Sequence, residues 1–184
     1  AVDRSILAVL IEPIKHDLQL SDLQLGLISG VAFSLFYAIL GIPFARWADV
    51  GSRRTLLTLT VGLWSIMTVL CGCAQNFIQL FLARMGVGIG EAGGSPAALS
   101  LLGDIYSPKR RGFATALFMV GGILGTVIGM WGGAVIATEW GWRTAFVAMG
   151  LPGVMLALLL KTTLREPRQD CRLPSLSETF GQDA

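Results

Sequence analysis

The sequence predicts an all-α integral membrane protein, and three observations support this fold class. Apolar residues make up 53% of the 184 residues and charged residues only 14%, which leaves too little polar surface for a soluble domain of this length. The chain contains long runs without Asp, Glu, Lys or Arg, as membrane-spanning helices do. Basic residues gather in alternate connections between these runs, as the positive-inside rule describes.

The first helix is expected within residues 1–14. This stretch is apolar apart from Asp3, Arg4 and Glu12, and it ends at Pro13 and the polar run 15–22. It is shorter than the roughly 20 residues that cross a bilayer. We therefore interpret it as the tail of a first span that begins upstream.

Five full spans are expected after it. The runs 23–45, 112–138 and 144–160 carry no charge, and a longer stretch divides at Ala74-Gln75-Asn76 into 55–74 and 77–103. We therefore predict a bundle of six transmembrane helices over residues 1–164. Residues 165–184 are polar, contain Pro167 and Pro174, and are predicted to form a loop or linker.

The basic residues predict the orientation. Most of the 14 Lys and Arg residues lie in two connections and after the last span: Arg46, Arg53 and Arg54; Lys109, Arg110 and Arg111; and Lys161, Arg165, Arg168 and Arg172. The positive-inside rule places these segments, the N-terminus and residues 165–184 in the cytoplasm. The expected location is the inner (plasma) membrane.

Two ionisable residues, Arg84 and Glu91, lie inside the predicted span 77–103. They are seven residues apart, which is two helical turns, so they share one face about 10 Å apart. A charge at mid-bilayer costs roughly 2.5 to 3.5 kcal/mol, and such residues usually have a function. The alternative is that they only hold neighbouring helices together.

Other kinds of site find little support. His16 is the only histidine, and the odd set Cys71, Cys73 and Cys171 has no ligand spacing. Gly88-Ile-Gly90-Glu-Ala-Gly93 matches a dinucleotide fingerprint but lacks the preceding strand that this motif requires. We predict no metal, no cofactor and no nucleic acid partner.

Two further patterns leave alternatives open. Gly121, Gly125, Gly129 and Gly133 recur every fourth residue, a spacing that permits close helix packing, whether static or sliding. Phe33, Phe36 and Tyr37 share a helical face. They line an apolar part of a cavity, or they face lipid or the protein core.

Several motifs resemble one family of membrane proteins. Residues 41–54, Gly-Ile-Pro-Phe-Ala-Arg-Trp-Ala-Asp-Val-Gly-Ser-Arg-Arg, are similar to the signature loop of the major facilitator superfamily, except at Ala45, Val50 and Ser52. Other segments resemble its spinster-like branch: Asp3-Arg4, Arg84 with Gly88-Ile-Gly90-Glu91-Ala92, Asp104 with Pro108-Lys-Arg-Arg-Gly112, and Trp142-Arg143 with Phe146.

The resemblance implies a secondary active transporter. Such proteins have two six-helix halves, each built from two inverted three-helix repeats, and this chain is expected to supply the first half. The missing C-terminal half is then its main partner, although a half-size transporter that pairs with itself is an alternative. The expected substrate is a small organic solute or anion, with amphipathic and lipid-like compounds among the candidates, and it is moved by alternating access coupled to protons.

Roles for individual residues follow as hypotheses. Glu91 with Asp3 is the expected proton-responsive site, and Arg4 or Arg84 is the counter-charge or the anchor for an anionic substrate. Asp49, Arg53 and Arg54 lie at helix ends, where they can meet Asp104 and helix dipoles. The resemblance implies that these four form a cytoplasmic gate. The alternative for Arg53 and Arg54 is that they only set the orientation.

Two other functional classes are alternatives. A membrane-embedded enzyme would need a nucleophile with a base, or a metal set, within the spans, and His16 alone does not provide it. A non-transporting membrane subunit that acts as a scaffold is the other alternative.

Overall fold

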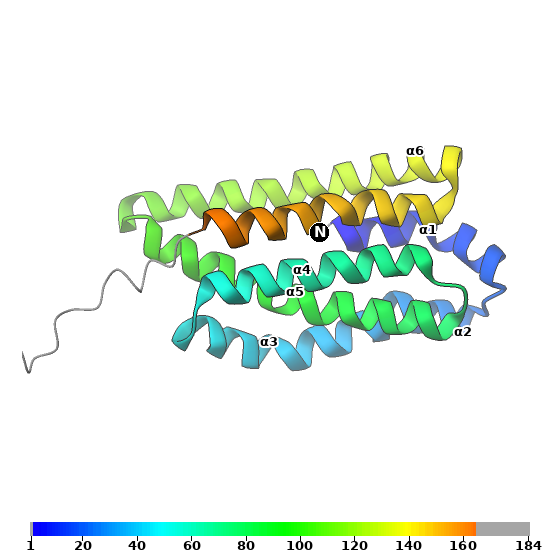
Figure 1. Cartoon of the computed structure of the whole chain (residues 1–184), viewed down its shortest axis with the longest axis horizontal. Helices are drawn as coiled ribbons and strands as arrows, with labels where there is room; N and C mark the ends of the chain where they lie inside the picture. The colour runs from blue at the N-terminus through cyan, green and yellow to red at the C-terminus, as the bar shows by residue number, and fades with distance from the viewer. Residues whose placement is uncertain (1, 165–184) are drawn as a thin grey trace, which may run out of the picture.

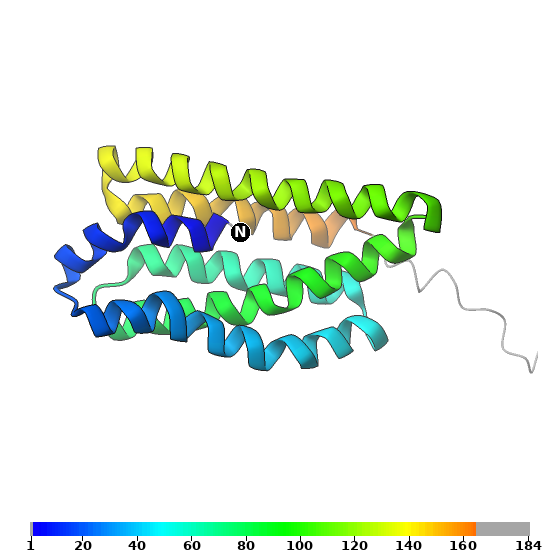
Figure 2. The ribbon, with the colours of Figure 1, turned by 180° about the vertical axis from the view of Figure 1, so that it is seen from behind.

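The computed structural model describes residues 2–164, with side chains from Ser5 onward, and all regular secondary structure in this part is helical. The long helices lie side by side in a bundle (Figures 1 and 2). The elements in chain order are α1 (Val2–Leu18), α2 (Asp22–Gly26), the π-helix η1 (Leu27–Val31), α3 (Ala32–Val50), α4 (Arg53–Cys73), α5 (Phe77–Ile105) and α6 (Pro108–Thr163).

The first helix is longer than predicted. The expected end at Pro13 is wrong, because α1 continues through this proline to Leu18. A proline removes one backbone donor, and the buried side chains of Leu10 and Ile14 on either side hold the helix against the core. The chain turns at Gln19, which adopts a positive φ of 49°.

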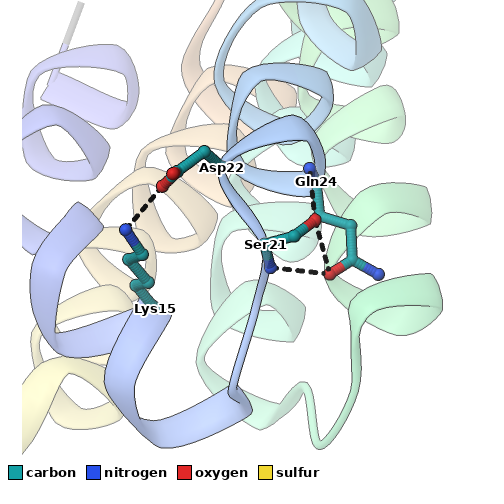
Figure 3. A network of polar contacts seen from close by, with 4 residues as sticks. All are labelled: Lys15, Ser21, Asp22 and Gln24. Carbon is teal, nitrogen blue, oxygen red and sulfur yellow. Dashed lines mark hydrogen bonds and ion pairs between the residues drawn. The ribbon is translucent and has the colours of Figure 1, made fainter.

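The second predicted span is also longer than expected. Asp22–Val50 forms one helical segment of 29 residues, and its start is closed by a capping box between Ser21 and Gln24 (Figure 3). The predicted span was expected to end at Ala45, within the motif at 41–54, but the helix continues to Val50. Only Gly51 and Ser52 connect it to α4, since the Ser52 hydroxyl accepts a hydrogen bond from the Thr55 amide and starts the next helix at once.

The predicted break at 74–76 is confirmed. Helix α4 ends at Cys73, and α5 begins at Phe77 with Asn76 as its cap. The boundary between the predicted spans 112–138 and 144–160 falls at Gly141, the one residue inside α6 with non-helical angles, φ 82° and ψ 162°. The chain reverses there, so α6 consists of two arms that lie side by side (Figure 1). We call residues 108–140 the first arm and 142–163 the second arm.

Three described segments are long and apolar enough to cross a membrane: Asp22–Val50, Arg53–Cys73 and Pro108–Thr163. They indicate an integral membrane protein, as the composition predicts. Helix α5 has sufficient length, but it is the helix that buries Arg84 and Glu91. The predicted loop 165–184, with Cys171, lies outside the described residues.

The glycine stripe on the first arm of α6 has two different environments. Gly129 and Gly133 are buried, and a methyl group on Gly133 would lie 2.7 Å from the Ile6 side chain of α1. Gly121 is exposed and has open space around it, while Gly125 is half-buried. Among the described residues, the stripe thus meets α1 at Gly133, while Gly121 at its other end lies in open space.

Candidate functional site

A cavity of about 330 Å³ lies where α1, η1, α3 and α5 meet. Its polar lining groups are one guanidinium and three hydroxyls, and the remainder is apolar. The lining residues are Leu7, Ala8, Ser29, Phe33, Ser34, Tyr37 and Arg84. It thus contains Arg84, which the sequence predicted as a site residue, and two of the three aromatic residues considered as cavity lining.

Arg84 is the only residue with a permanent charge among those that line the cavity. Its side chain is 2% exposed, and its guanidinium carbon lies 5.7 Å from the centre of the Phe33 ring. Phe33 in turn stacks on Tyr37, with ring centres 5.6 Å apart and planes inclined by 21°. A cation held over an aromatic face at low dielectric offers a strong site for an anionic group with an apolar body attached.

Close contact between α3 and α5 gives the cavity its shape. A methyl group on Gly88 would lie 2.7 Å from the carbonyl oxygen of Phe33, so only glycine allows the two backbones to approach this closely. The π-helical turn η1 precedes this contact and contributes Ser29, whose hydroxyl donates to the Leu25 carbonyl at 2.8 Å. Such turns are rare and often occur at functional sites.

None of the other three predicted coupling residues is among the described residues that line the cavity. Glu91 is 8% exposed, on the same helix as Arg84 and two turns along it, but it is not among the lining residues. Asp3 and Arg4 belong to α1, one turn before Leu7 and Ala8. Their side chains lie outside the described part, so their role stays a prediction.

The predicted gate residues are partly brought together. Arg53 is buried and forms an ion pair with Asp104, and it also donates to the carbonyls of Ala48 at 2.9 Å and Ser100 at 3.4 Å.

Arg54 donates instead to the carbonyl of Lys161 in the second arm of α6. The Asp49 side chain is exposed. We call Asp49, Arg53 and Asp104 the inner cluster, after the cytoplasmic side on which the sequence predicts them.

A second polar cluster was missed by the sequence analysis. Arg143 pairs with Asp17 of α1, donates to the Ala74 carbonyl at 3.3 Å, and lies 4.3 Å from the centre of the Trp142 ring. The indole of Trp142 also donates to Asp17, at 3.2 Å. Trp142 and Arg143 were noted only as part of a resemblance, because their partner lies 126 residues away from Arg143 in sequence.

Asp17 lies in the polar run after the apolar part of α1, outside the predicted span. The hydrogen bond from Arg143 lowers the pKa of this carboxyl group below its ordinary value of 3.8. The carboxylate is therefore charged at neutral pH, and the ion pair persists there.

Comparison with known proteins identifies the family. The model of the Major Facilitator Superfamily matches residues 1–178. The chain belongs to this superfamily. Among curated members it is 44% identical over 159 residues to an MFS-type efflux pump of Mycolicibacterium smegmatis, covering 86% of this chain and 37% of the pump. It is 32% identical to a probable L-galactonate transporter of Escherichia coli, covering 85% of this chain and 34% of that protein.

A solved superfamily structure has the same fold over the shared region. It is the crystal structure of a bacterial homolog of the human lysosomal transporter Spinster, in an inward-facing, unoccupied conformation. The match has a TM-score of 0.83 and 40% sequence identity, and it covers 90% of this chain and 40% of that one. The spinster-like resemblance is thus confirmed, and the relatives are transporters and not enzymes. The chain spans less than half the length of each of these relatives.

Proposed function

We propose that this chain forms one half of a secondary active transporter that moves an organic solute or anion by alternating access coupled to protons. The observation that carries the proposal is the buried guanidinium of Arg84 in a cavity beside the stacked rings of Phe33 and Tyr37. Such a group attracts an anion strongly where the protein excludes water.

The proposed half consists of six spans over residues 1–164: α1, the Asp22–Val50 segment, α4, α5 and the two arms of α6. In this proposal α1 to α4 form one three-helix repeat, and α5 and α6 form the inverted second repeat. The coverage of only 37% of a related pump supports a further C-terminal half, which would complete the cavity.

The cavity favours an amphipathic anion. A carboxylate or phosphate would pair with Arg84, and its apolar part would lie on Phe33 and Tyr37. The hydroxyls of Ser29 and Ser34 also allow a hydroxylated acid, and the galactonate in the name of one relative is a carboxylate. Lipid-like and polyhydroxy acids are therefore the two groups of compounds to test first.

Glu91, with Asp3, is the proposed proton carrier. It is buried on the helix that also carries Arg84, and carboxylates inside membranes often belong to proton or ion pathways. Exchange between a proton and a cationic partner would couple its charge to the occupancy of the cavity. In this scheme the inner cluster, with Arg54, acts as a gate on the cytoplasmic side of the inner (plasma) membrane.

Uptake by the purified full-length gene product in liposomes tests the proposal. We expect organic anions to accumulate faster when a proton gradient is imposed. Arg84→Ala should abolish uptake, because the anion loses its counter-charge. Glu91→Gln and Asp3→Asn should remove the response to the gradient while retaining anion exchange.

Glu12→Gln is the matched control, since this carboxylate is exposed on α1, and it should transport normally. Gradient-driven transport that survives in both Glu91→Gln and Asp3→Asn would refute the coupling role. Failure of the wild-type protein to move any anion would favour the scaffold alternative.

A further inference from the structure

One short sequence pattern occurs twice in the chain, at opposite ends of the bundle. An acidic residue, a glycine and an arginine are spaced at every second position in Asp49-Val-Gly51-Ser-Arg53 and again in Glu139-Trp-Gly141-Trp-Arg143. The first copy belongs to the inner cluster. The second copy contains the arginine of the cluster that the sequence analysis missed.

Both copies occupy the same kind of position in the fold. The glycine of each has an extended ψ angle, −170° at Gly51 and 162° at Gly141, and each interrupts the helical path. Gly51 separates α3 from α4, and Gly141 separates the two arms of α6. The arginine that follows each glycine by two residues therefore lies at the start of the returning helix.

The two arginines also make equivalent pairs. Arg53 pairs with Asp104, the next-to-last residue of α5, and Arg143 pairs with Asp17, the next-to-last residue of α1. Each arginine also donates to a carbonyl at the end of a helix: Arg53 to Ala48 near the end of α3, and Arg143 to Ala74, the residue that caps α4.

These pairs connect the two proposed repeats crosswise. Arg53 begins the third span of the first repeat and pairs with the first span of the second repeat. Arg143 begins the third span of the second repeat and pairs with the first span of the first repeat. In Figure 1, the α3–α4 connection lies at one end of the bundle, and the α1–α2 corner with the bend of α6 lies at the other.

We propose that Asp17, Glu139 and Arg143 form an outer gate cluster, the inverted counterpart of the inner cluster. This inference rests on the proposed transport function. The Arg143–Asp17 pair fixes the bend that carries the exposed Glu139. Glu139 is thereby held at the outer end of the bundle, as Asp49 is at the inner end. Each cluster favours closure at its own end, so the two oppose each other in setting the conformational equilibrium.

A neighbouring ion pair provides a matched control. Lys15 and Asp22 also pair at this end, across the corner between α1 and α2 (Figure 3). Asp22 is 87% exposed, and the pair is not part of either copy of the pattern. A general effect of charge at the outer end would act through this pair as well.

Accessibility labelling of the cavity from each side tests the proposal. In the full-length gene product, Cys71, Cys73 and Cys171 are replaced by serine, and Ser34→Cys places one reporter in the cavity lining. A membrane-impermeant maleimide is applied to intact cells and to inside-out vesicles. The measured quantity is the ratio of the outer to the inner labelling rate.

We expect Asp49→Asn to lower this ratio and Glu139→Gln and Arg143→Gln to raise it. Each change should be about two- to fivefold, the usual size of one interaction between partly exposed charged groups. The double variant Asp49→Asn with Glu139→Gln should return the ratio towards that of the parent. Lys15→Gln should leave it unchanged.

The proposal would be overturned if the ratio of outer to inner labelling stays unchanged, or falls, in both Glu139→Gln and Arg143→Gln. If Arg143→Gln does not fold, Glu139→Gln decides, because this exposed side chain contributes little to the core. Labelling requires no substrate, so a negative result here is distinguishable from failure of the transport experiment.

Discussion

Gly88 determines how closely α5 approaches α3 beside the cavity. The Phe33 carbonyl oxygen lies 2.7 Å from where a methyl group on Gly88 would be, and the obstacle is backbone, which cannot move aside as a side chain can. Phe33 carries the ring over which Arg84 lies. The position of Arg84 over the Phe33 ring therefore depends on the absence of a side-chain carbon at Gly88, on the same helix as Arg84.

We predict that Gly88→Ala destabilises the protein by about 1 to 3 kcal/mol, the usual cost of overpacking, and also slows transport because Phe33 and Arg84 shift. Thermal unfolding of the purified protein measures the first effect and liposome uptake the second. Gly41→Ala is the control, since that site in α3 has open space. Equal stability of the two variants would show that α3 and α5 can separate without cost.

Candidate functional residues could be predicted from the sequence where the free-energy cost of placing them depends only on the neighbouring residues of the chain. A charge within an apolar run is expensive wherever the helix packs, so Arg84 and Glu91 were identified without a structure. Asp17 was not, because its carboxylate lies in an ordinary polar run. Only its pairing with Arg143 and Trp142 distinguishes it.

At the scale of single helices, α6 shows how far periodicity can be used. The four-residue glycine spacing predicts a surface for close packing, and a methyl group on Gly133 would meet the Ile6 side chain of α1. The same spacing continues to Gly121, where nothing in the described chain lies within 4 Å. Periodicity defines a face of a helix, and it cannot define which part of that face is covered.

We predict that Gly133→Leu destabilises the protein more than Gly121→Leu, again measured by thermal unfolding. A leucine at 133 would displace Ile6 and separate α6 from α1, whereas a leucine at 121 extends into open space. In the full-length gene product the comparison also reports on the proposed second half. A Gly121→Leu variant as unstable as Gly133→Leu would show that another helix covers this end of the stripe.

Two predicted helix ends differ from those in the structure. Pro13 was expected to end the first helix, and the second span was expected to end at Ala45. Helix α1 instead continues to Leu18 and α3 to Val50. At Pro13, one missing backbone donor is a small cost compared with the burial of Leu10 and Ile14 on either side.

For the whole molecule, the pairing of Asp17 with Arg143 predicts a particular dependence of stability on pH. The pKa of Asp17 is lowered in the folded protein by Arg143. Its contribution is therefore complete above the ordinary carboxyl pKa, and it is lost as the pH falls from there through the lowered folded value. We predict that Asp17→Asn lowers the melting temperature at pH 7 and that this difference shrinks below about pH 4.

Melting curves of wild type and Asp17→Asn between pH 3 and pH 7 measure the effect, and Asp22→Asn serves as the control for an exposed acid at the same corner. A difference from wild type that stays constant over this range would contradict the role of the Asp17 charge.

The sequence by itself determined the class of protein, the helical content, the break at 74–76 and the charged residues of α5. Each of these follows from the cost of placing polar groups in hydrocarbon, which is paid residue by residue along the chain. Only the tertiary structure decided which charges meet. The pairing of Arg53 with Asp104, the pairing of Arg143 with Asp17, and the contact of Gly88 with Phe33 depend on how helices far apart in sequence pack together, and local composition does not encode that arrangement.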